Sequence, residues 1–456
     1  MESKRVQIKF LPSNKYNGII IPHALCRELG LDDKRQIVVQ LGQKKLMTRI
    51  LKVQRADRVI WIPPAIRLNL AIPFDGDLHV KVTGDTLRLG PVVGILTVGI
   101  SMTDNQLVSA RSSFFKHLLS AQRGESIFYF LFTPSDVDWN TKTVRGMFLR
   151  GEANGLTWRR FTVPLPDVVY NRIPDRQSEK LLSVTNFIKM LEENTDAKMF
   201  NPTFFNKWSI HQRLVDHPLA NRHIPETHVS PTVQKVDHML RKYGMVYLKP
   251  VTGSLGLGIL KLTYRPGIGY FCRYHSHSQN VVRRYRSLAT LLQNHLPKSR
   301  FSNYLVQQGI NLIRFKDRPL DFRVHAHKNR ENQWVVAAIA AKIAGLGSVT
   351  THVRTGGTVI LGQELLKQVF PQNSTYMEQQ IKETAILLAK AIESRLNQNI
   401  GELGFDIGID QKGHIWMFEA NSRPGRSIFK ANSLKDADNQ SIRLIVDYSK
   451  FLANFN

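Results

Sequence analysis

One stretch near the carboxyl end limits the folds open to this chain more than any other. Residues 404–425 read GFDIGIDQKGHIWMFEANSRPG. Residues 405–409 alternate apolar with acidic or small side chains, residues 411–413 supply a turn, and residues 415–418 form a second apolar run. Alternation with a period of two is typical of strands, and two such runs around a turn are typical of a hairpin. The sequence therefore predicts a β-hairpin over these residues.

Three oxygen-bearing side chains lie on this hairpin: Asp406 on its first strand, and Glu419 and Asn421 at the end of the second. Residues two apart on a strand point to the same face, so the hairpin can bring Asp406 opposite the other two. Two carboxylates and a carboxamide suit Mg²⁺, which takes its remaining oxygens from phosphates and water. A solvated acidic hairpin is the alternative. The apolar flanks, including Phe405 and Trp416, favour a buried site that needs a counter-charge.

The composition indicates a cytoplasmic protein that attracts anions. The 456 residues include 63 Lys and Arg against 36 Asp and Glu, a net charge of +27 without a long basic block. Such a spread favours a general attraction for anions over specific DNA binding. The two cysteines, Cys26 and Cys272, give neither a disulfide framework nor a zinc pattern. No signal-peptide core and no apolar run of membrane-spanning length occurs, so we expect no membrane span.

Residues 1–90 contain an internal repeat. The segment 21–31 recurs as 62–72, and in both a proline opens a short helix, where its missing N–H is not needed. A strand follows each helix, over residues 36–41 and 78–82. Two such copies predict a small β-rich domain that resembles a pseudo-symmetric double-psi or swapped-hairpin barrel. The alternative is chance similarity between two short helices. We expect this domain to fold separately from the rest.

Residues 91–200 have the pattern of an α/β domain. Residues 92–100 and 127–132 are continuous apolar runs, and a helical stretch over 112–123 separates them. Continuous apolar strands joined by helices are typical of a parallel sheet that is covered on both faces. A further helix over residues 178–193 leads into the third region.

Side chains that can bind phosphate accumulate from about residue 201. Lys207 opens a helical stretch, and the apolar strand 245–248 ends in Lys249, before a loop over residues 252–258 that is rich in glycine and hydroxyl groups. Backbone N–H groups of such a loop can approach phosphates closely. Most such loops are plain hairpin turns, and the GK[ST] signature of the P-loop is missing here.

A later strand carries Asp321 and Arg323. Arginine is a permanent planar cation that can clamp a phosphate or a developing oxyanion. Spacing along one strand lets Asp321 orient the guanidinium while part of it stays free. The segment from Thr375 predicts a long core helix, because Thr375 and Glu378 match a capping box and an apolar stripe follows.

The order of these motifs resembles that of the ATP-grasp fold. In order they are Lys207, Lys249, the loop 252–258, Gln307-Gln308-Gly309-Ile310, Asp321-x-Arg323, Gly356-Gly357, Asp406 and, most specific, Glu419-x-Asn421-x-x-Pro424-Gly425. The resemblance covers roughly residues 90–450. The whole chain resembles the YheC/YheD family of endospore coat-associated proteins from spore-forming bacteria.

The resemblance implies an α/β and α+β multidomain fold. A pre-ATP-grasp α/β domain would span residues 91–200, after the small β-rich domain of residues 1–90. An ATP-grasp domain would span residues 201–456, with two subdomains, about 201–303 and 304–456, that sandwich ATP.

The resemblance also implies ATP and Mg²⁺ as cofactors and gives each motif a role. Asp406, Glu419 and Asn421 would hold Mg²⁺, and Arg323 with Asp321 would act on the transferring phosphoryl group and the tetrahedral intermediate. The expected nucleotide contacts are Lys207, Lys249, Ser254, Gly256, Gly258, Gln307, Gln308, Gly309 and Ile310. The expected substrate contacts are Lys342, His352 and Arg354.

Two positions depart from the pattern of related peptide-forming ligases. Those enzymes usually have Glu where Gln308 stands, and Gln could still accept a hydrogen bond from the adenine amino group without carrying a charge. They often have N-x-H-x-G-G where this chain has His352-x-Arg354-x-Gly-Gly. The three metal ligands are intact, so the resemblance implies that ATP binding is kept.

Three functions compete. The leading one is an ATP- and Mg²⁺-dependent carboxylate–amine ligase that joins small-molecule or peptide substrates through an acyl phosphate. The second is a nucleotide-binding structural protein of the spore coat, with anionic coat or envelope components as partners. The third, a nucleic-acid binder, is disfavoured because no helix-turn-helix, zinc or RNP-type signature occurs. Substrate-reading loops have no diagnostic pattern, so the sequence does not identify the carboxylate or the amine.

Overall fold

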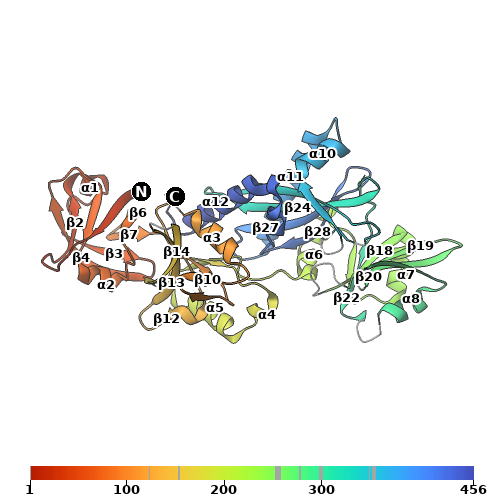
Figure 1. The fold of residues 1–456 in the computed structure, drawn as a ribbon, viewed down its shortest axis with the longest axis horizontal. Helices are drawn as coiled ribbons and strands as arrows, with labels where there is room; N and C mark the ends of the chain where they lie inside the picture. The colour runs from red at the N-terminus through yellow and green to blue at the C-terminus, as the bar shows by residue number, and fades with distance from the viewer. Residues whose placement is uncertain are drawn as a thin grey trace.

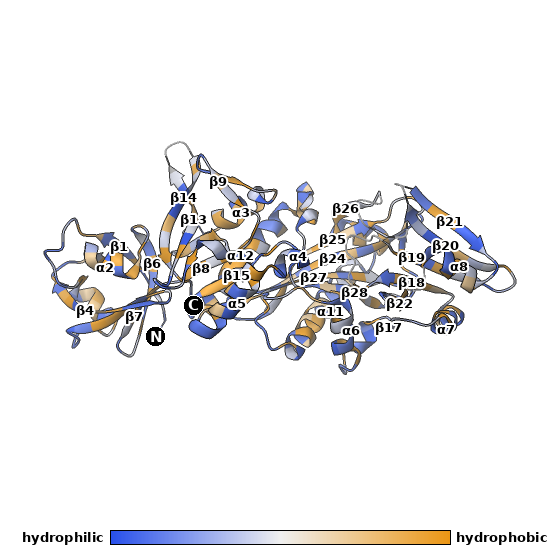
Figure 2. Cartoon of the chain, turned by 90° about the horizontal axis from the view of Figure 1, so that it is seen from below, coloured by the Kyte–Doolittle hydropathy of each residue, from blue (hydrophilic) through white to orange (hydrophobic). Residues whose placement is uncertain are grey.

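The molecule is elongated, with its sheets arranged one after another along the long axis (Figure 1). The computed structural model describes residues 2–122, 124–152, 155–251, 258–276, 279–296, 301–348, 350–351 and 356–455. Strands at the centre of the molecule, β8 (Val92–Leu96) and β15 (Val168–Asn171) among them, are largely hydrophobic (Figure 2). In the described part of the chain, no helix is long and apolar enough to cross a membrane.

The amino-terminal strands form a closed barrel with the order β1-β5-β2-β4-β3-β7-β6. The strands are β1 Lys4–Phe10, β2 Ile19–Pro22, β3 Gln36–Leu41, β4 Lys44–Val53, β5 Val59–Ile62, β6 Gly76–Thr83 and β7 Thr86–Gly90. Helix α1 (His23–Glu28) follows β2, and helix α2 (Pro64–Leu70) follows β5. The sequence repeat therefore corresponds to two strand–helix units, and the predicted β-rich barrel is confirmed.

The barrel packs on the central sheet through Phe74. Its ring makes edge contacts with Phe128, Phe148 and Phe161, at centroid distances of 5.1, 5.3 and 5.2 Å. The guanidinium of Arg150 lies 3.7 Å from the centre of the same ring. One buried hydrophobic cluster runs from the barrel into the central sheet. The boundary at residue 90 stays a prediction, but this shared core leads us to expect that the barrel and the central sheet unfold together.

The central sheet has the order β12-β13-β11-β8-β15-β16, with β14 on β13. Its remaining strands are β11 Phe128–Phe132, β12 Val137–Asp138, β13 Thr143–Glu152, β14 Gly155–Pro164 and β16 Lys198–Phe200, and a small hairpin holds β9 Ser101–Thr103 and β10 Gln106–Val108. Strand β8 pairs in parallel with β11 and β15, as its continuous apolar sequence predicts. It ends at Leu96 rather than at residue 100, before the chain turns at Gly99 (φ 67°).

The helices of the central region differ in part from the predicted ones. Helix α3 spans Ser112–Ser120, three residues shorter at its end than the expected stretch. The single helix expected over residues 178–193 is two helices, α4 (Arg176–Glu179) and α5 (Leu182–Asn194). The break arises because Leu181 has extended backbone angles, φ −60° and ψ 136°.

Two sheets make up the carboxyl-terminal half. The roof sheet has the order β17-β22-β18-β19-β20-β21, with strands β17 Thr227–Val229, β18 Met245–Pro250, β19 Leu260–Arg265, β20 Gly269–Ser276, β21 Gln279–Tyr285 and β22 Tyr304–Gln308. The floor sheet has the order β26-β25-β24-β27-β28, with strands β24 Arg318–Lys328, β25 Trp334–Ile343, β26 Thr358–Leu361, β27 Glu402–Ile409 and β28 Ile415–Asn421, and with β23 Arg314–Phe315 on β24. Helices α7 (Val233–Tyr243) and α8 (Leu288–His295) cover one face of the roof sheet.

Helix α11 (Ser374–Arg395) covers the floor sheet with the predicted apolar stripe, which is buried. The predicted capping box is wrong, because the N-cap is Asn373, two residues before Thr375, and it makes no side-chain cap bond. Glu378 instead pairs with Lys382 one turn on, at 2.7 Å. The other helices here are α6 Lys207–Val215, α10 Gly362–Val369 and α12 Lys435–Leu452. Helix α12 shares a buried cluster with the central sheet and also contacts β24 and β25, so it packs between the central sheet and the floor sheet.

Candidate functional site

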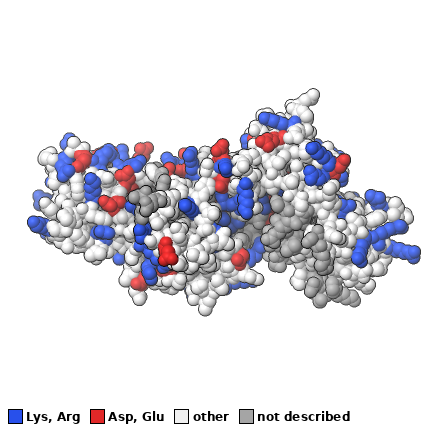
Figure 3. Space-filling view, in the orientation of Figure 1, with Lys and Arg blue, Asp and Glu red and all other residues white. Residues whose placement is uncertain are grey.

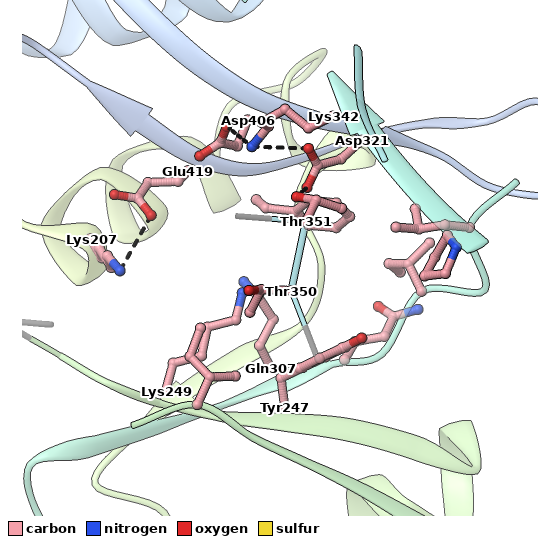
Figure 4. Close-up of a pocket in the computed structure, with 16 residues that line it drawn as sticks. Lys207, Tyr247, Lys249, Gln307, Asp321, Lys342, Thr350, Thr351, Asp406 and Glu419 are labelled. Atoms are coloured by element: carbon pink, nitrogen blue, oxygen red, sulfur yellow. Dashed lines mark hydrogen bonds and ion pairs between the residues drawn. The ribbon is translucent and has the colours of Figure 1, made fainter. Parts of the chain in front are cut away.

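A cleft between the roof and floor sheets gathers most of the expected site residues (Figure 4). It encloses a cavity of about 170 Å³. The expected residues that line it are Lys207, Lys249, Gln307, Gln308, Ile310, Asp321, Lys342, Asp406 and Glu419. The lining residues that the sequence analysis missed are Tyr247, Ile259, Leu312, Pro319, Thr350, Thr351 and Phe418. Tyr247 could have been found, because it lies two residues before Lys249 on one strand and so shares its face.

The hairpin of β27 and β28 brings its three oxygen-bearing side chains together. Asp406 lies directly opposite Glu419 across the hairpin. With its amide oriented to satisfy both neighbours, Asn421 donates to Glu419 Oε1 at 3.1 Å and accepts from Arg323 Nη1 at 3.2 Å. Two carboxylates and one carboxamide thus meet at the floor of the cleft.

A β-bulge places two neighbouring side chains of β28 in the cleft. The register shifts between Asp406 and Ile407. Asp406 pairs with Glu419 and Ile407 pairs with Met417, so Phe418 has no partner residue on β27. Phe418 and Glu419 both line the cavity. Strict alternation would place them on opposite faces, and a bulge is the device that redirects a side chain in this way. Alternation alone therefore could not identify Phe418 as a lining residue.

Lys342 joins two carboxylates on the floor. Its Nζ lies 2.9 Å from Asp321 Oδ1 and 2.8 Å from Asp406 Oδ1 (Figure 4). Burial tends to raise the pKa of Asp406, but Arg323 and then Lys342 outweigh it and lower the pKa to about 2. Burial raises the pKa of Asp321, and the Asp406 charge adds to the rise against the pull of Lys342. The pKa values of the two carboxyl groups are therefore shifted in opposite directions, and Asp406 is the one that stays ionised.

The donor set fits a hard divalent cation of the Mg²⁺ kind, which prefers carboxylate and carbonyl oxygens. Among the described residues, no group of three or more His, Cys, Asp and Glu side chains is arranged for a metal, so the fit depends on the Asn421 amide as well as the two acids. Lys342 holds Asp406, and Lys207 Nζ lies 3.3 Å from Glu419 Oε2. A cation would compete with both ammonium groups for these carboxylates.

The expected pairing of Arg323 with Asp321 is wrong. Both side chains do face the cleft side of β24, but Arg323 Nε lies 3.3 Å from Asp406 Oδ1, because β27 is the neighbouring strand and Asp406 is the direct partner of Arg323. Asp321 instead accepts a hydrogen bond from Thr351 Oγ1 at 2.5 Å and pairs with Lys342. Arg323 is thus fixed against the candidate metal ligands themselves.

Two lysines face the cleft near the same hairpin. Lys249 Nζ donates to Gln307 Oε1 at 2.6 Å. Burial, and then the charge of Lys207, lower the pKa of Lys249 to about 8. Lys207 is the first residue of helix α6, whose N-cap Asn206 accepts from Trp208 N and Ser209 N. Two cations near each other in a low-dielectric cleft attract an anion strongly.

The strand that ends in Gln307-Gln308-Gly309 bounds the cleft on the roof side. Gln307 is the residue that bonds Lys249, and its Nε2 donates to Thr227 Oγ1 at 3.1 Å. Gln308 lines the cavity too, but its Oε1 accepts from Glu226 N at 3.2 Å. Both glutamine side-chain oxygens therefore already accept a hydrogen bond within the protein, and the acceptor role expected of Gln308 stays a prediction. Gly309 is required here, because a Cβ would lie 2.7 Å from the carbonyl oxygen of Met245.

Not all of the expected contacts are found among the residues that line the cavity. Ser254, Gly256, His352 and Arg354 fall outside the described residues. Gly258 is described: its φ is 71°, which favours glycine, and its carbonyl accepts from Tyr304 Oη at 3.2 Å. Gly258, Gly309, Arg323 and Asn421 do not line the cavity itself, although the last two contact residues that do.

Comparisons with known proteins agree with the ATP-grasp resemblance. A family model described as YheC/D-like ATP-grasp matches residues 196–452. The endospore coat-associated protein YheD of Bacillus subtilis (strain 168) is 34% identical over 440 residues, which cover 96% of this chain and 94% of that protein. YheC of the same organism is 23% identical over 301 residues, 65% of this chain and 80% of that protein.

Solved structures with a similar fold include D-alanyl-alanine synthetase A from Vibrio cholerae O1 and the ATP-grasp ligase PsnB in complex with a minimal precursor. The first is 13% identical, with a TM-score of 0.44 over 80% of this chain and 99% of that one. The second is also 13% identical, with a TM-score of 0.43 over 78% and 99%. Family membership rests on the sequence matches, which span more than half of this chain. The chain belongs to the YheC/D-like ATP-grasp family.

Proposed function

We propose that this protein binds ATP with Mg²⁺ and joins a carboxylate to an amine through an acyl phosphate. The observation that carries this proposal is the single cleft in which Asp406, Glu419 and Asn421 meet beside Arg323 and two lysines. Such a cleft supplies what phosphoryl transfer needs, which is positioning and charge stabilisation rather than covalent catalysis by the protein.

The nucleotide would lie between the two sheets. Tyr247 and Ile259 of the roof side and Phe418 of the floor give the cavity apolar walls suited to a purine ring. Lys207 and Lys249 would bind the phosphates, and Asp406, Glu419 and Asn421 would hold Mg²⁺. When bound, Mg²⁺ neutralises charge on the phosphate oxygens.

The reaction has two steps. In the first, a carboxylate oxygen of the substrate forms a bond to the γ-phosphorus, and the bond from that phosphorus to ADP breaks. In the second, the amine forms a C–N bond at the acyl carbon, the C–O bond to phosphate breaks, and the nitrogen loses a proton. Arg323, held by Asp406 and Asn421, would stabilise the oxyanion charge that develops in both steps. Asp321, a cavity-lining carboxylate whose pKa is raised mainly by burial, is the candidate to accept the amine proton.

The location and the alternative functions depend on the names of the relatives and on the distribution of surface charge. The printed names of the two relatives associate them with the endospore coat, and we extend that association to this protein as a proposal. A structural nucleotide-binding coat protein would keep the same ATP site without turnover. On the face shown in Figure 3, Lys and Arg are scattered with Asp and Glu among them, rather than gathered in one stripe. That distribution does not favour a nucleic-acid binder.

The test is release of ADP from Mg²⁺-ATP by the full-length protein, screened against paired carboxylates and amines from cell wall and coat material. A ligase releases ADP and phosphate in step with product only when both partners are present. Mg²⁺-ATP binding without stimulated turnover by any pair would instead support the structural coat protein. Absence of Mg²⁺-ATP binding would remove the ATP site itself.

A further inference from the structure

Three cations stand at the edge of the cleft, next to Tyr247 and away from the metal residues. Lys261 on β19 lies directly opposite Tyr247 on β18 and Arg273 on β20. Directly opposed residues of antiparallel strands point to the same face, so this row shares the cleft face that Tyr247 lines. The Lys261 ammonium lies 5.9 Å from the centre of the Tyr247 ring.

The third cation, Arg314, comes from the floor side. It lies on β23 opposite Pro319, which also lines the cavity. Burial, then Arg273 and then Arg314 lower the pKa of Lys261 to about 8. The two arginines are therefore near enough to disfavour the charged form of the lysine, although they belong to different sheets.

Lys261, Arg273 and Arg314 are called the outer cations. In the described part of the chain, no ion pair joins any of them to a carboxylate. Arg273 donates to the carbonyl of Gly347 at 3.2 Å, and Arg314 to the carbonyl of Asp317 at 3.3 Å. A guanidinium has five N–H donors, so both retain donors without a protein acceptor among the described residues.

The unbalanced charge contrasts with the lysines of the floor. Lys342 and Lys207 each have a carboxylate within 3.3 Å. Lys261 and Arg273 are partly buried, and partly buried cations without a counter-charge are costly. Together with the exposed Arg314 they make a site that is matched to an anion brought by a ligand. The carbonyl that Arg273 holds belongs to the loop that leads to Thr350 and Thr351 of the cavity wall, so the outer cations adjoin the space open to a second substrate.

We propose that the outer cations bind an oxyanion group, a carboxylate or a phosphate, of the second substrate beside the nucleotide. This inference rests on the proposed function, since it assumes that ATP occupies the inner cleft with Lys207 and Lys249. It narrows the substrate class to molecules that carry at least one anionic group besides the reacting carboxylate.

The test uses the full-length protein with Mg²⁺-ADP at saturation. Binding of fluorescent tetraglutamate and of inorganic pyrophosphate is compared between wild type and the Lys261→Met/Arg273→Met variant. We expect wild type to bind at least one probe and the variant to bind it at least about tenfold more weakly, because hydrogen bonds to charged groups are the strong ones. The probe that binds identifies the carboxylate or the phosphate form of the ligand.

The matched control is Arg283→Met. Arg283 lies on β21 of the same sheet, opposite Cys272, on the face that α7 and α8 cover, so its loss should leave probe binding unchanged. Arg314→Met removes an exposed side chain and serves as a second variant if the double variant does not fold.

Three results would overturn the proposal. The first is that neither probe binds wild type in the presence of Mg²⁺-ADP. The second is that the control variant weakens probe binding as much as the double variant does. The third is an equal loss of Mg²⁺-ATP affinity in the double variant, which would assign the outer cations to the nucleotide. Each of these leaves the proposed ATP site intact, whereas failure of wild type to bind Mg²⁺-ATP at all would refute the proposed function first.

Discussion

The floor and the roof of the cleft handle charge in opposite ways. On the floor every cation that approaches the hairpin has a carboxylate: Lys342 bridges Asp321 and Asp406, and Arg323 holds Asp406. On the roof, Lys249 bonds a neutral amide, and Lys261 has no carboxylate within ion-pair distance in the described part of the chain. The charges around the hairpin of the floor are balanced without a ligand, whereas the roof has positive charge that a ligand must balance. From this difference we expect the hairpin of the floor to bind the metal and the cations of the roof to contribute to anion binding.

Removal of one floor lysine tests that difference most severely. Lys342→Met leaves two buried carboxyls without their shared cation, so we expect unfolding to become easier by about 3–5 kcal/mol, the usual cost of breaking a buried pair. Lys261→Met on the roof breaks no ion pair and should cost far less. Urea denaturation of both variants at neutral pH measures the two values. Equal losses would show that floor and roof do not differ.

Replacement of the floor arginine tests the chemistry rather than the stability. Arg323→Lys keeps the charge but cannot contact Asp406 and Asn421 together, so we expect substrate-stimulated ATP turnover to fall at least about a hundredfold, as for loss of one oxyanion donor. Mg²⁺-ATP affinity should stay near that of wild type. Steady-state kinetics with calorimetry gives both numbers. A variant that retains most of its turnover would reduce Arg323 to a structural partner of Asp406.

Removal of the floor acids tests whether the hairpin binds the metal. Ligand binding to the folded state stabilises it by about 2.7 kcal/mol at a hundredfold excess over the dissociation constant. We expect Mg²⁺-ATP to raise the melting temperature of wild type, and the Asp406→Ala/Glu419→Ala variant to lose that rise. Mg²⁺ alone should give little rise even in wild type, since Lys342 and Lys207 already occupy these carboxylates. A nucleotide shift that persists in the variant would contradict the assignment.

The pH dependence of binding tests the roof. Lys249 has a pKa of about 8, lowered mainly by burial, so its charge is lost as the pH rises through that value. Mg²⁺-ATP affinity should fall above about pH 8 by up to about tenfold per unit, because a bound phosphate favours the charged lysine. Lys249→Met should remove this dependence, as isothermal titration between pH 7 and 9.5 would reveal. A flat wild-type profile would mean that Lys249 does not contact phosphate.

The same lysine gives a stability prediction for the protein without nucleotide. Its folded pKa of about 8 lies below the ordinary value of 10.5, so the unfolded chain binds more protons between those pH values. Stability should therefore rise with pH across that window as far as Lys249 contributes. The difference between wild type and Lys249→Met in the unfolding free energy, followed against pH, isolates this contribution.

Much of the fold could be predicted because the signals are local. Alternation along β27 and β28 indicated the hairpin, and the repeat around residues 21–31 and 62–72 indicated the barrel. Both depend on residues that are close in sequence, where the period of the side chains reports the element directly.

The contacts of the site could not be predicted because they depend on strand order. Arg323 meets Asp406 because β24 lies between β25 and β27, and Lys342 reaches both acids for the same reason. A sequence shows that a strand exists but not which strand lies beside it, so it favours the partner nearest in sequence, Asp321, over the true partner on the neighbouring strand. The bulge at Phe418 was missed for a related reason, since one passed-over residue leaves no mark on composition.

The bulge in β28 has one more consequence, for how the two sides of the candidate site move together. Phe418 is suited to the base and Glu419 to the metal and phosphates, and the two are adjacent residues that both line the cavity. Adjacent Cα atoms are about 3.8 Å apart whatever the rest of the molecule does. The backbone positions that carry these two side chains therefore keep a fixed spacing. If the roof sheet moves relative to the floor sheet, the contacts made by the roof residues can change while this spacing stays constant.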